Sequence, residues 1–332
     1  MDYRTECPEV IRDFLTYHET IKGHSRATVD EYFLDLRTFF RFLKQLRGLA
    51  PDNADFERIS ISDVDIALIR SVALSDVYEF LTYLARDRTS VQSAGNAGLK
   101  SASRARKIST LRSFYKYLTV KAHILEENPL QDLDSPKIAK TLPRFLTLEE
   151  SRRLLLAVTG KNKARDYCIL CIFLNCGLRI SEIVGLNLGD VRSDHLRVMG
   201  KGSKERIVYL NDSTAEAING YLLVRRGIET KDRNALFLSN QRSRMVRGSV
   251  HHMVKTTLLK AGLDSSKYSA HKLRHTAATL MLKNGVDVRT LQELLGHEHL
   301  NTTQIYTHVD NSDLHMAADA NPLASFSPDK PE

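Results

Sequence analysis

The chain has 332 residues, a length typical of about two domains. Its composition is 42% hydrophobic and 27% charged, which argues against an intrinsically disordered chain. The net charge is +8 and the pI about 9.2. This basic balance favours an anionic partner, most often nucleic acid, over a basic protein that has no such partner.

The sequence gives no sign of a membrane or secreted protein. Charged residues of both signs are scattered through the first twenty positions, so we expect no signal peptide. The longest apolar run, at 167–174, is too short to span a bilayer. Four cysteines in a chain this long do not make a disulfide framework. Cys168 and Cys171 have CxxC spacing, but they lie in an apolar run and are expected to be buried and structural. We therefore expect a cytoplasmic protein.

The N-terminal part reads as helical. Apolar residues recur with a period near 3.6 in each helical segment, and Gly, Pro, Asn and Asp interrupt the pattern between segments. Ser25 is a natural N-cap for the second helix. The predicted helices are 8–22, 25–47, 74–88 and 100–119, and the predicted loops are 48–62 and 89–98.

The helix predicted at 100–119 is strongly basic. From Arg88 to Leu125 the chain has eight basic residues and no acidic one. Such a face suits a phosphate backbone, whereas a solvated face usually mixes both signs. The helix is therefore predicted to contact DNA, with a merely solvated face as the alternative. The residues predicted to bind DNA are Arg104, Arg106, Lys107 and Arg112.

A proline-containing segment at 126–144 reads as a linker, and a second domain follows it. Thr147 and Glu150 form a capping box at the start of this domain. Two short strands, 195–199 and 206–210, flank a Gly-Lys-Gly-Ser-Lys turn. Helices are predicted at 147–158, 163–176, 213–226, 247–261, 271–284, 288–295 and 302–308. The predicted organisation is an N-terminal helical domain at 1–125, the linker 126–144, a second domain at 145–320 and a flexible tail at 321–332.

Two arginines in this second domain could bind one phosphate. Arginine stays charged and presents a planar fork of donors. Arg179 follows a Gly-Leu break at the start of a short helix, where anions bind well. Arg274 lies between His271 and His275, which are four residues apart on one predicted helix. The HExxH zinc pattern requires Glu at the position of Lys272, so proton transfer or phosphate binding is favoured over a metal site.

Three further residues are individually weak candidates. His297 follows Gly296 at a predicted helix end. Tyr306 lies nine residues later, and nearby cations would favour its phenolate and make it a better nucleophile. Lys201 in the hairpin turn could deliver a proton to a leaving oxygen. Taken alone, a core tyrosine and a solvated lysine would be the ordinary interpretations.

Together these motifs resemble the tyrosine recombinases, the phage integrase family, and most closely the bacterial Xer recombinases. The resemblance covers nearly the whole chain and carries six catalytic positions in the family order, from Gly-Leu-Arg-Ile-Ser-Glu to Thr-Thr-Gln-Ile-Tyr-Thr-His. The matched positions are Arg179, Lys201, His271, Arg274, His297 and Tyr306.

The resemblance implies a fold and a mechanism. The fold would be mainly α with a small β-hairpin in the catalytic domain, arranged as a two-domain C-shaped clamp. Tyr306 would form a 3′-phosphotyrosine, the arginines and His297 would hold the phosphate, Lys201 would act as general acid and His271 would assist proton transfer. Neither metal nor ATP would be required.

The resemblance also implies partners. Four protomers, identical or mixed, would act on double-stranded DNA with an inverted-repeat site, and an activating protein could be needed. The segment 310–320 would dock on a neighbouring protomer. Resolution of chromosome or plasmid dimers is the expected role. The long segments 48–71 and 89–98 depart from a typical Xer protein, so a recombinase of a mobile element stays open as an alternative. A type IB topoisomerase, which shares the chemistry, and a non-catalytic DNA-binding protein on the same fold are separate alternatives.

Overall fold

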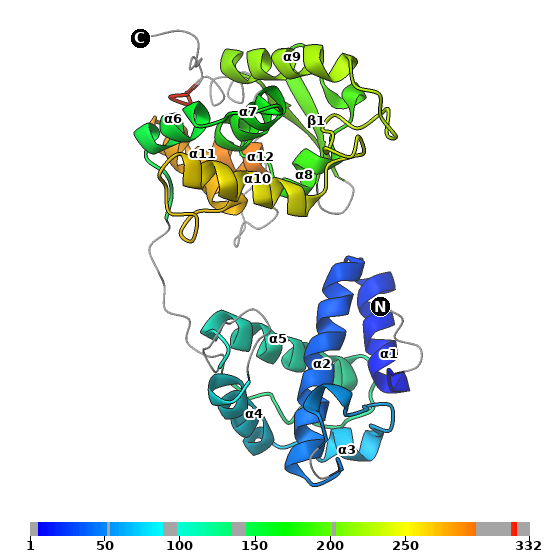
Figure 1. Ribbon diagram of the computed structural model, residues 1–332. Coiled ribbons are helices and arrows are strands. Elements are labelled where there is room, and N and C mark those ends of the chain that lie inside the picture. Colours follow the sequence, from blue (N-terminus) through cyan, green and yellow to red (C-terminus); the bar gives the residue numbers. More distant parts are fainter. Residues whose placement is uncertain are drawn as a thin grey trace. The chain divides into compact units, whose positions relative to one another are not determined.

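The computed structural model describes residues 6–51, 54–88, 98–134, 144–200, 204–296 and 320–323. These residues form two compact units, 1–141 and 142–332 (Figure 1). The described residues are mainly helical and contain one sheet of two antiparallel strands. No helix in these ranges is long and apolar enough to cross a membrane.

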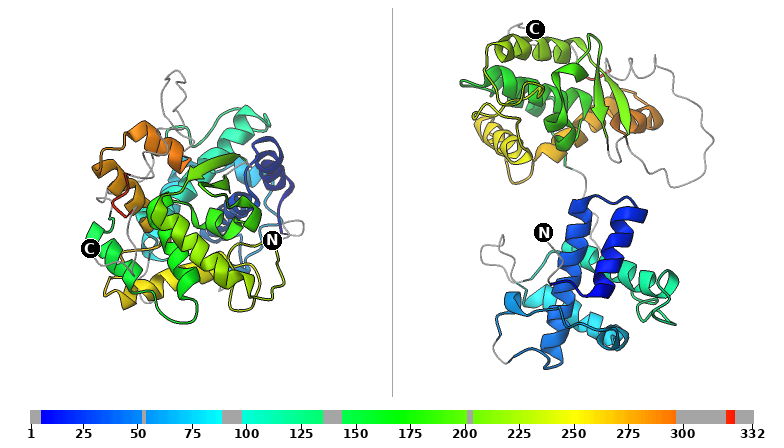
Figure 2. Two further views of the ribbon diagram at one scale, coloured as in Figure 1. Left: turned by 90° about the horizontal axis from the view of Figure 1, so that it is seen from above. Right: turned by 90° about the vertical axis from the view of Figure 1, so that its right-hand side faces the viewer.

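Unit 1 is built around α2 (Arg26–Leu46), which packs against three other helices. Ser25 caps α2 by accepting a hydrogen bond from the amide of Thr28, as the sequence predicted. Figures 1 and 2 both show α1 (Glu9–Thr16) lying alongside α2. The other main partners of α2 are α4 (Leu74–Arg86) and α5 (Ser101–Val120). A π-helical turn, η1 (Tyr17–Ile21), continues α1.

Unit 1 contains two features that the sequence pattern did not reveal. A short helix, α3 (Ile66–Arg70), and a 3₁₀ turn, η2 (Phe56–Arg58), lie between α2 and α4. In addition, the segment predicted as a linker begins too early. Leu130 and Leu133 follow Pro129, and their apolar side chains are buried in the hydrophobic core of unit 1.

The core of unit 2 consists of one large hydrophobic cluster and a smaller one that contains Met281, Val286 and Leu291. Its helices are α6 (Leu148–Leu156), α7 (Lys163–Cys171), α9 (Asp212–Arg226), α10 (Arg247–Lys260) and α11 (Ala270–Lys283). The π-helical turn η3 (Ile172–Cys176) continues α7 and packs against α11. Cys168 and Cys171 are fully buried, as the apolar run predicted, and burial raises the pKa of Cys171 to about 12.

The remaining elements of unit 2 carry the residues of interest. They are the short helix α8 (Ile180–Gly185), the 3₁₀ turn η4 (Leu188–Asp190), the strands β1 (His195–Met199) and β2 (Glu205–Tyr209), and α12 (Val288–Leu295). The two strands pair with His195 opposite Tyr209 and Met199 opposite Glu205, and Figure 2 shows them as adjacent arrows. Thr147 and Glu150 form the predicted capping box at α6.

The start of the segment predicted as a flexible tail is buried. Leu323 lies in the core of unit 2, and the side-chain amide of Asn321 donates to the carbonyl of Leu174 at 2.8 Å. Asn284 also donates to the carbonyl of Ala320 at 2.7 Å. An apolar side chain and two amide contacts thus hold residues 320–323 on unit 2. Residues 310–319, predicted to dock on a neighbour, lie outside the described residues.

Candidate active site

The first candidate residue, Arg179, stands at the N-cap of α8. Gly177 ends η3 in the left-handed conformation, with φ of 60°, and turns the chain into this helix. Glu182, three residues after Arg179, accepts a hydrogen bond from the Arg179 amide at 2.7 Å and another from its Nη1 at 2.9 Å. The side chain of Arg179 keeps 37% of its surface exposed, so its guanidinium is held from one side and open on the other.

The second candidate, Arg274, comes from α11 and is nearly buried, with 6% of its side chain exposed. Its Nη1 donates to the carbonyl of Gly177 at 2.5 Å, and its Nη2 donates to the carbonyl of Leu295 at 2.6 Å. These bonds fix the guanidinium between the end of η3 and the end of α12. The fold therefore brings together the two arginines that the sequence selected, although 95 positions separate them along the chain.

A third arginine, Arg206 on β2, completes the cluster and was not selected from the sequence. Its two Nη atoms donate to the two carboxylate oxygens of Glu182 at 2.8 and 2.9 Å. Its Nε donates to the carbonyl of Leu294 at 3.4 Å. Glu182 ends the Gly-Leu-Arg-Ile-Ser-Glu motif and Arg206 begins the second predicted strand, but neither local pattern indicates that the two side chains meet. We call Arg179, Arg206, Arg274 and Glu182 the arginine cluster.

The three arginines of the cluster donate hydrogen bonds to backbone carbonyls at the C-terminal end of α12. The carbonyls of Leu294, Leu295 and Gly296 accept hydrogen bonds from Arg206, Arg274 and Arg179 respectively. Helix C-terminal carbonyls lack partners within the helix and carry partial negative charge, so cations stabilise them. Gly296 adopts the left-handed conformation, with φ of 63°, that commonly ends a helix.

Charge within the cluster is unbalanced. Three guanidiniums face one carboxylate, which leaves a surplus of two positive charges. Burial alone would raise the pKa of Glu182, but hydrogen bonds from Arg206 and Arg179 lower it, so the carboxylate stays ionised. Burial, aided by the charges of Arg179 and Arg206, lowers the pKa of Arg274 to about 10. The surplus positive charge can be neutralised by an anion.

The histidines of α11 lie on the same helix as Arg274. His271 occupies the first turn, three residues before Arg274, and is exposed. His275 is half-buried, and its ring meets that of Phe145 edge-on, with the centroids 6.4 Å apart. Burial, followed by the charges of Lys272 and His271, lowers the pKa of His275 and keeps it neutral. His271 is thus the histidine of this helix that an incoming ligand can reach.

Three predicted site residues, Lys201, His297 and Tyr306, lie outside the described residues. The described chain nevertheless fixes the positions beside two of them. Gly200 and Lys204 pair across the hairpin, with the amide of Gly200 donating to the carbonyl of Lys204 at 2.8 Å. Gly296, whose carbonyl binds Arg179, immediately precedes His297.

Comparison with known proteins identifies the family. The model of the phage integrase family matches residues 144–313, about half of the chain. A tyrosine recombinase XerC from Caldanaerobacter subterraneus subsp. tengcongensis is 50% identical over 318 residues, covering 96% of this chain and 88% of the relative. The chain belongs to the phage integrase family. It is a site-specific tyrosine recombinase of the Xer type.

Other relatives agree with this assignment. A tyrosine recombinase XerD from Proteus mirabilis is 41% identical over 306 residues, covering 90% of this chain and 88% of the relative. Among solved structures, the XerH recombinase bound to its difH substrate is 25% identical, with a TM-score of 0.57, and the match covers 93% of this chain and 84% of that one. A λ integrase dimer bound to a core site is 16% identical, with a TM-score of 0.57, and the match covers 90% of this recombinase and 99% of that chain. This likeness shows a shared fold.

The four residues predicted to bind DNA differ in how far their side chains are exposed. Arg106 on α5 is exposed over 45% of its side chain and contacts Glu31 and Asp35 of α2, each at 2.7 Å. Lys107 instead points inward. Its Nζ lies 2.8 Å from the fully buried carboxylate of Asp35, which also accepts from Thr110 at 2.9 Å. The prediction for Lys107 is therefore corrected, because its ammonium forms a buried ion pair between α2 and α5.

The other two predicted DNA-binding residues are half-buried on α5. Arg104 donates to the hydroxyl of Ser101 at 3.1 Å, and its Nε is buried without a hydrogen-bond partner among the described residues. Arg112 is also half-buried and has an interaction within the protein. On the described part of α5, the exposed basic side chains are those of Arg106 and Lys116.

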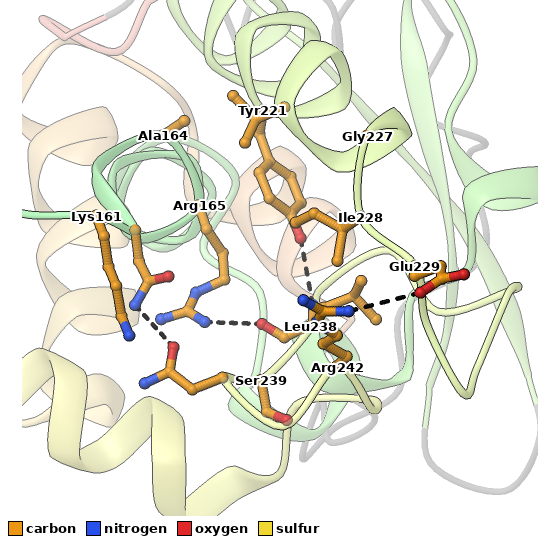
Figure 3. A pocket seen from close by; sticks show the side chains of 13 residues that line it. Lys161, Ala164, Arg165, Tyr221, Gly227, Ile228, Glu229, Leu238, Ser239 and Arg242 are labelled. Atoms are coloured by element: carbon orange, nitrogen blue, oxygen red, sulfur yellow. Dashed lines mark hydrogen bonds and ion pairs between the residues drawn. The ribbon is translucent and has the colours of Figure 1, made fainter.

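A hollow of about 470 Å³ lies elsewhere in unit 2 (Figure 3). Figure 3 shows Arg165 and Tyr221 both reaching Leu238: Arg165 donates to its carbonyl at 2.7 Å, and the Tyr221 hydroxyl accepts from its amide at 3.2 Å. The described residues that line it include none of the arginine cluster. These side chains satisfy the backbone of a loop, and the hollow is not part of the candidate active site.

Proposed function

We propose that this recombinase cuts and rejoins DNA by transferring a phosphodiester to Tyr306. The phenolic oxygen of Tyr306 would lose its proton and form a bond to phosphorus, and the bond from phosphorus to the 5′ oxygen would break. The products are a 3′-phosphotyrosine and a 5′-hydroxyl, which takes up one proton. Attack by a 5′-hydroxyl of another strand would reverse the step, so the bond energy is conserved and strands can be exchanged.

The charge surplus of the arginine cluster is the observation that carries this proposal. A phosphodiester has one negative charge, and its pentavalent transition state has two, which would balance the two surplus positive charges of the cluster. Donors that are held in place before the reaction stabilise such charge best. Arg179 supports this role, since its exposed guanidinium uses two N–H groups for Glu182 and Gly296 among the described residues and arginine has five.

The remaining roles follow the motif matches. Lys201 would give its proton to the 5′ oxygen, and His271 would assist proton transfer from the exposed first turn of α11. His297 would add a hydrogen bond to the phosphate. The position of Gly296 against the arginine cluster supports this role, because the backbone just before His297 lies at the cluster.

The partner proposed is double-stranded DNA with inverted half-sites. Four protomers would act on two duplexes. The role proposed is resolution of chromosome or plasmid dimers in the cytoplasm, during chromosome partition and cell division. Similarity to XerC and XerD proteins supports the Xer type of recombinase on which this role rests. The alternative role is integration or excision of a mobile element. A second recombinase or an activating protein belongs to this proposal as well.

Covalent capture tests the proposal. The protein is mixed with fragmented genomic DNA of its source, quenched in denaturant, and the attached DNA is sequenced. Tyr306→Phe is run beside it and should bind DNA almost normally, because it lacks only one hydroxyl. We expect one locus to be enriched with the wild type and lost with the variant.

The attached locus also decides the biological role. A site near the replication terminus would support dimer resolution, and a site at the boundary of a mobile element would support integration. Adducts that persist in Tyr306→Phe would overturn the assignment of the nucleophile. Binding without any adduct, even with a candidate second recombinase added, would contradict the proposed reaction. Relaxation of plasmids that lack the captured site would instead favour topoisomerase activity.

A further inference from the structure

Arg206 has an unusually complete set of partners for a residue in a short hairpin. Its fork meets both oxygens of Glu182, and its third nitrogen reaches the carbonyl of Leu294. Only 15% of the side chain is exposed. All three guanidinium nitrogens are therefore occupied by protein oxygens. In this arrangement Arg206 itself does not offer a free edge to a phosphate.

Glu182, which binds the guanidinium of Arg206, also binds Arg179. Glu182, with 3% of its side chain exposed, accepts from both the amide and Nη1 of Arg179. The same two oxygens receive the Arg206 fork, so each carboxylate oxygen is shared by the two arginines. Charge-assisted paired bonds of this kind are strong and set orientation as well as distance. With Arg206 removed, the carboxylate would lose its better-buried partner and with it the contacts that fix the carboxylate plane.

Arg206 also packs against the end of α12. A β-carbon on Gly296 would lie 3.1–3.3 Å from Cδ, Nε and Cζ of Arg206, which is closer than a side chain normally tolerates. The absence of a side chain on Gly296 therefore favours this close approach to Arg206. This approach places the Gly296 carbonyl at 3.0 Å from Nη2 of Arg179. The contacts of the Arg179 guanidinium with Glu182 and Gly296 thus both depend on elements that Arg206 touches.

We propose that Arg206 is a positioning residue, which orients Arg179 for the phosphate through Glu182 and the end of α12. This inference rests on the proposed function, because it assigns Arg179 to the phosphate. A lysine at position 206 keeps the charge but cannot make the paired bonds, since its ammonium is a point charge without a fork. The arrangement thereby ties strand β2 to α8 and α12 and fixes the open face of Arg179.

The test compares Arg206→Met and Arg206→Lys with the wild type on a nicked duplex that traps the covalent adduct. The duplex is the locus recovered by covalent capture. Misplacing a catalytic group by about 1 Å can reduce a rate on the order of 100-fold. We expect a loss of this order in Arg206→Met, a partial recovery in Arg206→Lys, and DNA affinity within a few-fold of the wild type. Arg197→Met, which removes an exposed arginine from the neighbouring strand, is the matched control and should keep the wild-type rate.

A second substrate separates two ways in which Arg206 could act. A 5′-bridging phosphorothiolate releases a sulfur that needs no proton from a general acid. If Arg206 orients Arg179, the defect persists on this substrate. If Arg206 instead served the proton donor of the hairpin, the defect would disappear, and that result would overturn the inference. A wild-type adduct rate in Arg206→Met would overturn it as well.

A measurement without any reaction keeps this inference distinct from the proposed function. Nitrogen-15 labelling of arginine gives the Nε–Hε signals of Arg179 and Arg274, which are assigned by single substitutions. In Arg206→Met or Arg206→Lys, the Arg179 signal should move toward that of a free, rapidly exchanging guanidinium, while the backbone spectrum shows that the variant is folded. An unchanged Arg179 signal in a folded variant refutes the positioning role, even where the wild type forms no adduct. Loss of the wild-type adduct alone would count against the proposed function only.

Discussion

Arg274 donates to the carbonyl of Gly177 at 2.5 Å, and Gly177 packs against Leu295 so closely that the site has no room for a β-carbon. A β-carbon at this position would lie 2.7 Å from Cδ2 of Leu295 and 3.9 Å from Cγ of Arg274. Gly177 also has a φ of 60°. The turn that leads to Arg179 and the carbonyl that holds Arg274 therefore come from one glycine.

Replacing Gly177 with alanine should damage both stability and activity. The left-handed conformation costs a non-glycine residue about 1–2 kcal/mol, and the contact with Leu295 adds to that loss. Gly262→Ala is the matched control, because Gly262 has a φ of 67° and a β-carbon added there would meet no atom within 4 Å. Urea denaturation should show a larger loss for Gly177→Ala, and only Gly177→Ala should slow adduct formation. Equal adduct rates in the two variants would contradict the role of this turn.

Glu31→Gln should strengthen DNA binding. Glu31 lies 2.7 Å from the exposed guanidinium of Arg106, so it competes with a phosphate for this arginine. An exposed ion pair is worth up to about 1 kcal/mol, so affinity should rise by about two- to fivefold. Arg106 keeps its contact with Asp35, but with one carboxylate fewer beside it the arginine can bind a phosphate more strongly, and the salt dependence of binding should steepen. Glu79→Gln, the same charge change on the exposed side of α4, is the control. If both variants gain the same DNA affinity, the effect comes from the overall charge of the protein, and the prediction for Arg106 is wrong.

Asp35→Asn should unfold unit 1 more readily. The change leaves the buried ammonium of Lys107 without its counter-charge, and breaking a buried ion pair from one side costs about 3–5 kcal/mol. Lys107→Met should destabilise unit 1 less, because it removes a charge and leaves Arg106 beside Asp35. Chemical denaturation followed by circular dichroism measures both. A stable Lys107→Met variant whose DNA binding has a flatter salt dependence would restore Lys107 as a DNA contact.

The stability of unit 1 should fall as the pH drops from 7 to 5. Burial, followed by the charges of His24 and Lys22, lowers the pKa of His18 from 6.5 to about 4. The unfolded chain therefore binds a proton at a higher pH than the folded chain, so acidification favours unfolding between these two values. The loss attributable to His18 is about 2 kcal/mol at pH 5.

His18→Gln provides the comparison for this pH effect. The ring of His18 contacts His24 at 3.2 Å between their Nδ1 atoms and Ser113 at 3.3 Å. Without the titrating ring, denaturation midpoints should change less between pH 7 and pH 5 than in the wild type. Parallel pH profiles for the two proteins would show that another group causes the acid sensitivity.

Local sequence patterns predicted most helices of the fold because they depend on short-range physics. Ser25 and Thr147 were recognised as caps, and the 3.6-residue period located the long amphipathic helices. The two paired strands also lie at or within one residue of the predicted positions. The short helix α3 was missed, since five residues give too little periodicity to detect. The burial of Leu130 and Leu323 was missed because their partners are distant in sequence.

By itself, the sequence determined the family-like motifs, the helical character and the choice of Arg179 and Arg274, because these are matters of residue type and spacing. Only the tertiary structure decided that Arg206 and Glu182 join them and that Lys107 faces a buried carboxylate. The physical reason is that an ion pair depends on distance and burial. Both are set by packing between segments far apart in the chain, and no local pattern records them.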